Sequence, residues 1–96
     1  MIVVRNVFQA KYGKGDELVQ LLKEYTTMWP SGRNARILTD LSGPFFTAVG
    51  EVIYDSLSAW ETDSREIFGD ARFAAWFERT VPLVDSGRRE FYNLVE

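Results

Sequence analysis

Cysteine and histidine are both absent from the 96-residue chain. Without cysteine there is no disulfide framework, no thiol nucleophile and no thiolate metal site. Without histidine the chain lacks the commonest general base, the commonest metal ligand and the usual proximal haem ligand. Any proton transfer must therefore use Asp, Glu, Tyr, Lys or Arg. We expect no metal site and no bound cofactor.

Long apolar runs and an excess of charge are also missing. No run approaches the roughly 18–20 apolar residues that a membrane span needs, and Met1 leads straight into Ile2-Val3-Val4 with no visible signal peptide. The formal net charge is −3, and a mildly acidic chain does not attract nucleic acid or anionic lipid. We therefore expect a cytoplasmic protein with no nucleic-acid or membrane partner.

Large apolar side chains, in contrast, are plentiful. Hydrophobic residues make up 46% of the chain and aromatic residues 15%. A domain of this size buries only about 60% of the surface that its unfolded chain exposes. The surplus of apolar side chain predicts a partner surface or a ligand pocket. We expect one domain over residues 1–96.

The hydrophobic pattern predicts strands and helices in the order β-α-β-β-α-β. The expected strands are 2–8, 35–41, 45–54 and 89–95, and Asp85-Ser86-Gly87 is expected to be a turn. An apolar stripe runs from Leu18 to Trp29 on the first helix, for which Asp16 is a plausible N-cap. The second helical region starts at Ser56 or Ser58 and is interrupted at Gly69-Asp70, where Asp70 can cap a second piece. This order predicts a ferredoxin-like α+β fold, a four-stranded antiparallel sheet with helices on one face.

The expected strands carry apolar residues on both faces. In 2–8, for example, Val4 and Phe8 share one face with Asn6, while Val3 and Val7 share the other with Arg5. A single layer of helices covers only one face of such a sheet. The other face can be covered by a second sheet, and packing about a two-fold axis is the simplest solution. The pattern therefore predicts a homodimer.

Several segments resemble those of a known superfamily: Val7-Phe8-Gln9, Lys11 to Leu18, Val49-Gly50-Glu51-Val52, Asp55 to Trp60, and Asp70 with Phe73. With these, nearly the whole chain resembles the dimeric α+β barrel superfamily, in particular its NIPSNAP-like and antibiotic-biosynthesis-monooxygenase-type members. The resemblance implies a homodimer whose two sheets close a barrel, with a pocket between each sheet and its own helices. Members include cofactor-independent oxygenases, haem-degrading monooxygenases and isomerases, so fold alone does not choose among them.

The haem-degrading members allow a comparison of single residues. They use an Asn on the first strand, a Trp at the end of the third strand and a His on the second helix. Asn6 matches the first position, whereas Tyr54 occupies the second and the third falls near Phe77. The residue that would bind iron is therefore missing, and haem degradation by that mechanism is not expected.

Asn6 and Tyr54 are the candidate catalytic residues. Asn6 lies on an apolar strand face, so it either bonds to the backbone or to Asn93 or orients a ligand or dioxygen. Tyr54 could donate a hydrogen bond or a proton to a substrate carbonyl, or be a wall of the core. The candidate ligand-binding residues, which could equally be core, are Tyr25, Trp60, Trp76 and Phe77.

Arg5 and Glu51 are expected inside the dimer barrel, because both lie on the strand faces that point away from the helices. They can form a cross-strand ion pair, or a charged interface site in which Glu51 is a base. Arg36 and Asp40 are expected at a solvated edge.

Two functions follow from these features. The first is binding of a small hydrophobic or aromatic molecule between sheet and helices, with cofactor-independent oxygenase-type chemistry if the protein is an enzyme. In that case Asn6 and Tyr54 would polarise or orient the substrate. The alternative is a non-catalytic dimerisation or binding module in which the same residues fill a core.

Overall fold

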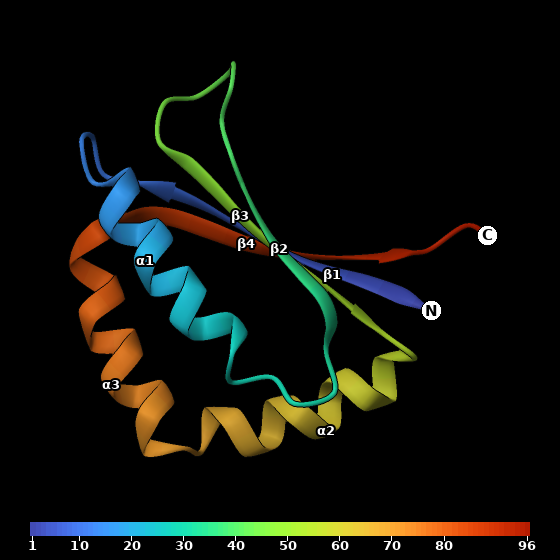
Figure 1. Ribbon diagram of the computed structural model, residues 1–96. Helices are drawn as coiled ribbons and strands as arrows, with labels where there is room; N and C mark the ends of the chain where they lie inside the picture. Colours follow the sequence, from blue (N-terminus) through green and yellow to red (C-terminus); the bar gives the residue numbers. More distant parts are fainter.

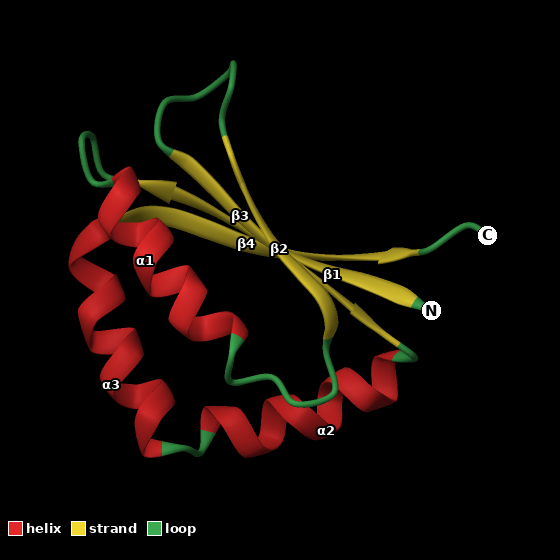
Figure 2. Ribbon diagram, in the orientation of Figure 1, coloured by secondary structure: helices red, strands yellow, loops and turns green.

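The computed structural model describes residues 1–96 as two layers, a sheet and a set of helices that cover one of its faces (Figure 1). The sheet has four strands in the order β2-β3-β1-β4, and every neighbouring pair is antiparallel. All the helices lie on the same side, so the opposite face of the sheet is bare (Figure 2). The α+β fold and the ferredoxin-like order predicted from the sequence are confirmed. No helix is long and apolar enough to cross a membrane.

The elements follow one another as β1 (Ile2–Ala10), α1 (Gly15–Thr26), β2 (Arg33–Thr39), β3 (Thr47–Tyr54), α2 (Leu57–Phe68), α3 (Ala71–Thr80), a 3-10 turn (Val81–Leu83) and β4 (Val84–Asn93). Side-chain caps fix two of the helix starts. Ser56 accepts a hydrogen bond from the backbone N–H of Ala59 (3.1 Å) at the start of α2. Asp70 accepts one from the N–H of Arg72 (2.8 Å) at the start of α3. Both caps satisfy N–H groups that a helix start leaves unpaired.

The predicted cap of α1 is wrong. The helix begins earlier, with Lys14 at its N-cap position and no side-chain cap. Asp16 instead lies in the first turn beside Glu17. Their negative charges still stabilise the helix there, because the N-terminal end of a helix dipole is positive.

The strand starts also differ from prediction, most of all in β4, which starts at Val84 and contains Ser86 and Gly87. The expected turn at Asp85-Ser86-Gly87 is therefore wrong. Gly87 serves close packing, because a Cβ added there would lie 3.1 Å from a ring atom of Phe8. β3 starts at Thr47 rather than Phe45, since Phe46 has a φ of 60° and leaves the extended conformation.

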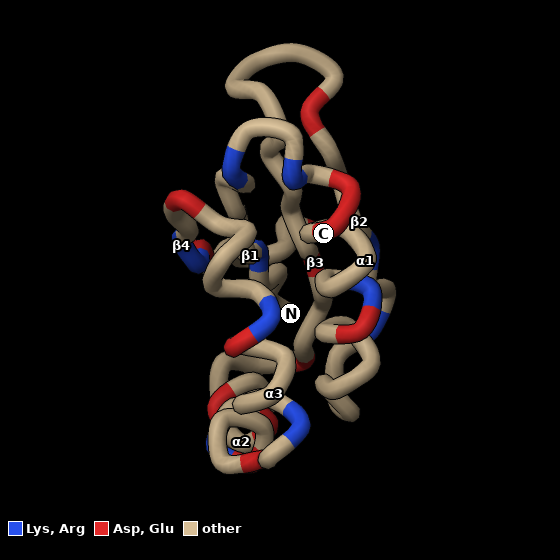
Figure 3. The backbone as a smooth tube through the Cα atoms, turned by 90° about the vertical axis from the view of Figure 1, so that its left-hand side faces the viewer, with Lys and Arg blue, Asp and Glu red and all other residues tan.

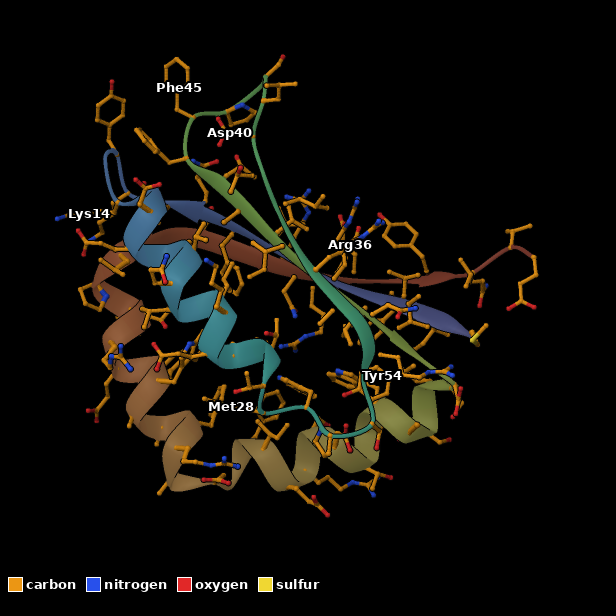
Figure 4. All side chains as sticks on the ribbon, viewed as in Figure 1. Lys14, Met28, Arg36, Asp40, Phe45 and Tyr54 are labelled. Atoms are coloured by element: carbon orange, nitrogen blue, oxygen red, sulfur yellow. The ribbon has the colours of Figure 1, made fainter.

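The register separates the two sheet faces as the sequence predicted. Asn6 of β1 lies opposite Gly50 of β3, on the face covered by the helices. Arg5 lies opposite Glu51, on the bare face. Figure 4 shows the same division, with Arg36 on the bare side of the sheet and Tyr54 on the side that faces α2.

The core fills the space between the helices and the covered face. Its buried hydrophobic residues come from the three α-helices, from β1 and β3 and from the loop after α1: Val4, Ala10, Leu18, Leu21, Leu22, Tyr25, Trp29, Ala48, Tyr54, Ile67 and Trp76. Aromatic rings form a continuous part of it, because Tyr25 stacks on Trp76 (4.6 Å between ring centroids) and Trp29 stacks on Trp60 (6.1 Å). This aromatic cluster forms the walls of the candidate site.

Candidate functional site

Two cavities lie between the sheet and its helices. The narrow cavity is lined by Asn6, Tyr25, Trp29 and Trp60 among others, and has room for about one water molecule. The wide cavity has about 690 Å³ of empty space that opens to solvent, and seven of its nine lining residues are hydrophobic. Tyr25 lines both cavities. The four predicted ligand-binding residues are thus divided: Trp60 lines the narrow cavity, Trp76 and Phe77 line the wide one, and Tyr25 lines both.

Asn6 and Arg89 form a polar pair on the covered face of the sheet. The two residues are cross-strand neighbours in β1 and β4. The Nε atom of Arg89 donates a hydrogen bond to Oδ1 of Asn6 (2.9 Å). The partner of Asn6 is therefore an arginine side chain, rather than the backbone or Asn93 as one prediction had it. Asn6 lines the narrow cavity and Arg89 lines the wide one, so their side chains lie between the two.

The guanidinium group of Arg89 lies among aromatic rings. Its Cζ atom is 5.3 Å from the centroid of Trp60 and 5.7 Å from that of Phe68. A cation at such distances is attracted by the negative face of the ring. The rings therefore help to hold a positive charge against the helices.

Tyr25 brings a hydroxyl group to the same place. Burial raises the pKa of Tyr25, and the nearby positive charge of Arg89 offsets only part of this rise. The phenol therefore remains protonated at neutral pH. It can donate its O–H to a ligand in the wide cavity.

Tyr54, the second predicted catalytic residue, lines neither cavity and is fully buried. Its hydroxyl donates a hydrogen bond to Oδ2 of Asp63 (2.7 Å), and Asp63 also accepts from the backbone N–H (2.9 Å) and the hydroxyl (3.1 Å) of Ser31. Burial, and then the carboxylate of Asp63, raise the pKa of Tyr54 far above its ordinary value. In this arrangement Tyr54 ties β3 to α2 and to the loop after α1. Its catalytic role stays a prediction.

The bare face carries a row of charges across the sheet. Glu51 accepts hydrogen bonds from Nε of Arg5 (2.7 Å) and from Nε of Arg36 (2.7 Å), one on each carboxylate oxygen. Burial raises the pKa of Glu51, but the bonds from Arg36 and Arg5 outweigh it, and the net shift is downward. The predicted ion pair of Arg5 and Glu51 is confirmed. Arg36 lies on the edge strand β2 with 69% of its side chain exposed, as expected, and is also the second partner of Glu51.

The row continues to β4, where Glu90 lies opposite Arg5 and accepts a hydrogen bond from Nε of Arg88 (2.8 Å). Positive and negative groups alternate along it, and over the whole chain Figure 3 shows basic and acidic residues interspersed. A base must be free to take a proton, whereas Glu51 is held as a carboxylate by two arginines. Nowhere do three carboxylates come close enough together to hold a metal ion.

Two important residues were not singled out from the sequence. Arg89 carries no motif signal, although alternation along a strand places it and its neighbour Arg88 on opposite faces. Asp63 lies inside a helix and carries no cap or motif signal, and only the fold brings it to Tyr54 and Ser31. The predicted strand 89–95 already contained Arg89, and alternation along it places Arg89 on the face of Phe91.

No family model and no curated protein matches the chain, but solved structures do. A NIPSNAP domain protein from Burkholderia xenovorans superposes with a TM-score of 0.86 at 20% identity, covering 99% of this chain and 95% of that one. A NIPSNAP family protein from Agrobacterium tumefaciens gives 0.85 at 20% identity, covering 99% and 86%. The chain has the NIPSNAP-type fold. An antibiotic biosynthesis monooxygenase-like protein from Deinococcus radiodurans also matches, with a TM-score of 0.74 at 19% identity over 100% and 94% of the chains.

The NIPSNAP-type likeness confirms the superfamily resemblance predicted from the sequence, at the level of fold. At this identity it says nothing of which reaction, if any, the chain performs. What the chain does must be inferred from its own cavities and charges.

Proposed function

We propose that the protein binds a small hydrophobic or aromatic molecule in the wide cavity between its sheet and its helices. One observation carries this proposal: an apolar, solvent-open cavity has the Asn6–Arg89 pair at its edge. Ligand pockets in proteins typically combine apolar walls with a few polar groups that orient the ligand.

If the protein is an enzyme, we propose cofactor-independent oxygenase-type chemistry on the bound molecule. The narrow cavity is of the size to hold water or dioxygen next to Asn6. Asn6 would orient the reacting group, and Tyr25 would be the hydroxyl that reaches the ligand, with Tyr54 behind it in the core. The antibiotic biosynthesis monooxygenase-like neighbour agrees with this chemistry in name and fold only. The alternative is a binding module without turnover.

We further propose that the protein works as a homodimer joined through the bare faces of two sheets. Apolar rows flank the charge row on this face: Val3 lies beside Ile53 and Tyr92 on one side, and Val49 lies beside Val7 and Leu38 on the other. Part of this apolar surface is exposed, including 37% of Leu38 and 49% of Tyr92. A second sheet would remove it from water, and this gain is the usual driving force of association.

Native mass spectrometry of the freshly purified chain tests both parts of the proposal. A dimer mass that carries a small-molecule adduct is the expected result, and the mass of the adduct indicates its class. A monomer contradicts the dimer. A ligand-free dimer whose melting temperature no small aromatic compound raises contradicts the binding function.

A matched pair of variants locates the bound molecule. Phe77 and Leu57 are similarly exposed helix residues, at 53% and 47%, but only Phe77 lines the wide cavity. Phe77→Ala should therefore weaken binding of an aromatic ligand, while Leu57→Ala leaves it unchanged. Equal effects of the two substitutions would place the ligand elsewhere.

A further inference from the structure

Arg89 differs from every other arginine of the chain in its partners. Arg5, Arg33, Arg36, Arg65, Arg72, Arg79 and Arg88 each pair with a carboxylate. Arg89 has no carboxylate partner; its guanidinium group lies over the rings of Trp60 and Phe68, on a side chain that is still exposed to solvent. Water hydrates this charge in the free protein, and an anion in the cavity would supply the counter-ion that the other arginines already have.

The wide cavity contains hydrogen-bond donors that are not used within the protein. Four of its lining side chains, two of them aromatic, carry a polar group: Tyr25, Trp76, Thr80 and Arg89. Trp76 donates its indole N–H to the carbonyl of Leu21 (2.6 Å), and Thr80 donates its hydroxyl to the carbonyl of Trp76 (2.9 Å). The donors of these two residues are therefore satisfied within the protein. Those that remain belong to Tyr25 and Arg89.

Asn6 determines which atoms of Arg89 remain available. Arginine can only donate, so the amide of Asn6 must present its oxygen to Nε. This bond uses the side of the guanidinium group. It leaves the two terminal nitrogens, Nη1 and Nη2, which lie beside the hydroxyl of Tyr25 and together match the two oxygens of a carboxylate approaching end-on.

The donor excess extends beyond the wide cavity. The indole N–H of Trp29 is buried, makes no hydrogen bond and belongs to a residue that lines the narrow cavity. Both Trp29 and Arg89 lie close to the hydroxyl of Tyr25. Because neither of them can accept a hydrogen bond, the O–H of Tyr25 is left to donate to something outside the protein.

We infer that the ligand of the wide cavity is a small aromatic carboxylate. Its carboxylate would bind Nη1 and Nη2 of Arg89 and accept the O–H of Tyr25, and its ring would lie among Phe73, Trp76 and Phe77. This inference rests on the proposed function and adds the charge of the ligand to it. Asn6 acts as a positioning residue, because it reaches the ligand through Arg89.

Calorimetric titration with 2-naphthoate and 2-naphthamide tests the inference, since the two probes share shape and ring and differ in charge. The native chain should bind naphthoate about ten- to a hundredfold more tightly than naphthamide, the range expected for hydrogen bonds to a charged group. Arg89→Met should reduce this ratio to about one, and Arg89→Lys should restore only part of it, because lysine cannot bind a carboxylate in two places.

The control is Arg65→Met, which changes the net charge equally on the exposed surface of α2. It should leave the ratio as in the native chain, and circular dichroism should show all variants folded. Equal affinity of the native chain for the two probes overturns the inference but keeps the binding function. A preference for naphthoate that survives in Arg89→Met also overturns it. If neither probe binds, and no neutral aromatic compound does, the proposed function fails with it.

Discussion

The two faces of the sheet differ in how their charged groups are paired. On the bare face every charge of the central row has a partner, and Glu51 bridges two arginines from neighbouring strands. On the covered face Arg89 has only the neutral amide of Asn6. The contrast is sharpest in β4, where consecutive arginines face opposite sides and only Arg88 has a carboxylate. The charges of the bare face are already paired, whereas Arg89 is the arginine that still has donors to offer to the proposed ligand.

The helix layer that covers the sheet contains a buried polar group that is fully satisfied, Asp63 of α2, and its loss should have the largest effect. Asp63→Ala would leave the backbone N–H and hydroxyl of Ser31 and the hydroxyl of Tyr54 without an acceptor. The buried hydroxyl of Tyr54 left unpaired costs about 1–3 kcal/mol, and Ser31, which is exposed, can pair its donors with water in part, so we expect a loss of about 3 kcal/mol in the free energy of unfolding. Denaturant unfolding measures it. A loss below about 1 kcal/mol would mean that water replaces the carboxylate.

Glu51→Gln tests how much the ion pairs on the bare face contribute to the free energy of unfolding. It removes the only charge shared by Arg5 and Arg36, and breaking a buried pair costs about 3–5 kcal/mol. Because the two arginine side chains are 37% and 69% exposed, solvent screening reduces the expected loss to about 2 kcal/mol. The exposed pair of Glu61 and Arg65 is the control, and Glu61→Gln should change stability little.

The same variant has a defined pH dependence. The pKa of Glu51 in the folded chain lies below its ordinary value of 4.5. The charge of Glu51 therefore contributes its full stabilisation above the pKa of the unfolded chain, and this contribution is lost as the pH falls through the pKa of the folded chain. The native chain should therefore lose its advantage over Glu51→Gln below about pH 4.5. An advantage that is equally large at about pH 3 would show that the charge of Glu51 is not its source.

The hydrogen-bonded pair of Asn6 and Arg89 should contribute little to the free energy of unfolding. Replacing both partners of a hydrogen bond by apolar groups of similar shape is nearly neutral or stabilising. The double variant Asn6→Leu with Arg89→Met should thus be as stable as the native chain or up to about 1 kcal/mol more stable. Arg89→Met alone should cost about 1 kcal/mol, because it leaves the oxygen of Asn6 unpaired. A double variant less stable than either single one would show that the pair is structural.

The smallest expected effects come from the two tyrosines, and these separate their roles. Tyr54→Phe removes the bond to Asp63 and should cost about 1 kcal/mol of stability without changing naphthoate affinity. Tyr25→Phe should leave stability within about 0.5 kcal/mol and weaken naphthoate binding several-fold. Loss of ligand binding in Tyr54→Phe with intact stability would reverse this assignment and restore Tyr54 to the site.

The sequence was sufficient for the architecture because local signals agreed with one another. The alternation in β1 and the apolar stripe of α1 placed the two sheet faces and the helices correctly, and the caps Ser56 and Asp70 marked helix starts. It failed where tertiary contacts override local preference. Gly87 looks like part of a turn, yet it lies in a strand because the ring of Phe8 needs the space above it.

The candidate site was predicted only in part, for a related reason. The aromatic walls follow from helical periodicity, and Asn6 stands out as polar on an apolar face. Arg89 and Asp63 do not stand out, because charged residues are common on strand edges and helices. Their meaning depends on partners 83 and 32 positions away in the chain, and such pairings appear only once the sheet order is known.

The side-by-side placement of Arg88 and Arg89 also has a thermodynamic consequence. One short stretch of β4 contributes to the surface through which we propose that two chains associate and to the cavity proposed to take the ligand. If the bound molecule changes the tendency of the chains to pair by some factor, pairing must change the affinity for the molecule by the same factor. Ligand affinity measured over a range of protein concentrations would then show whether dimerisation and ligand binding are coupled.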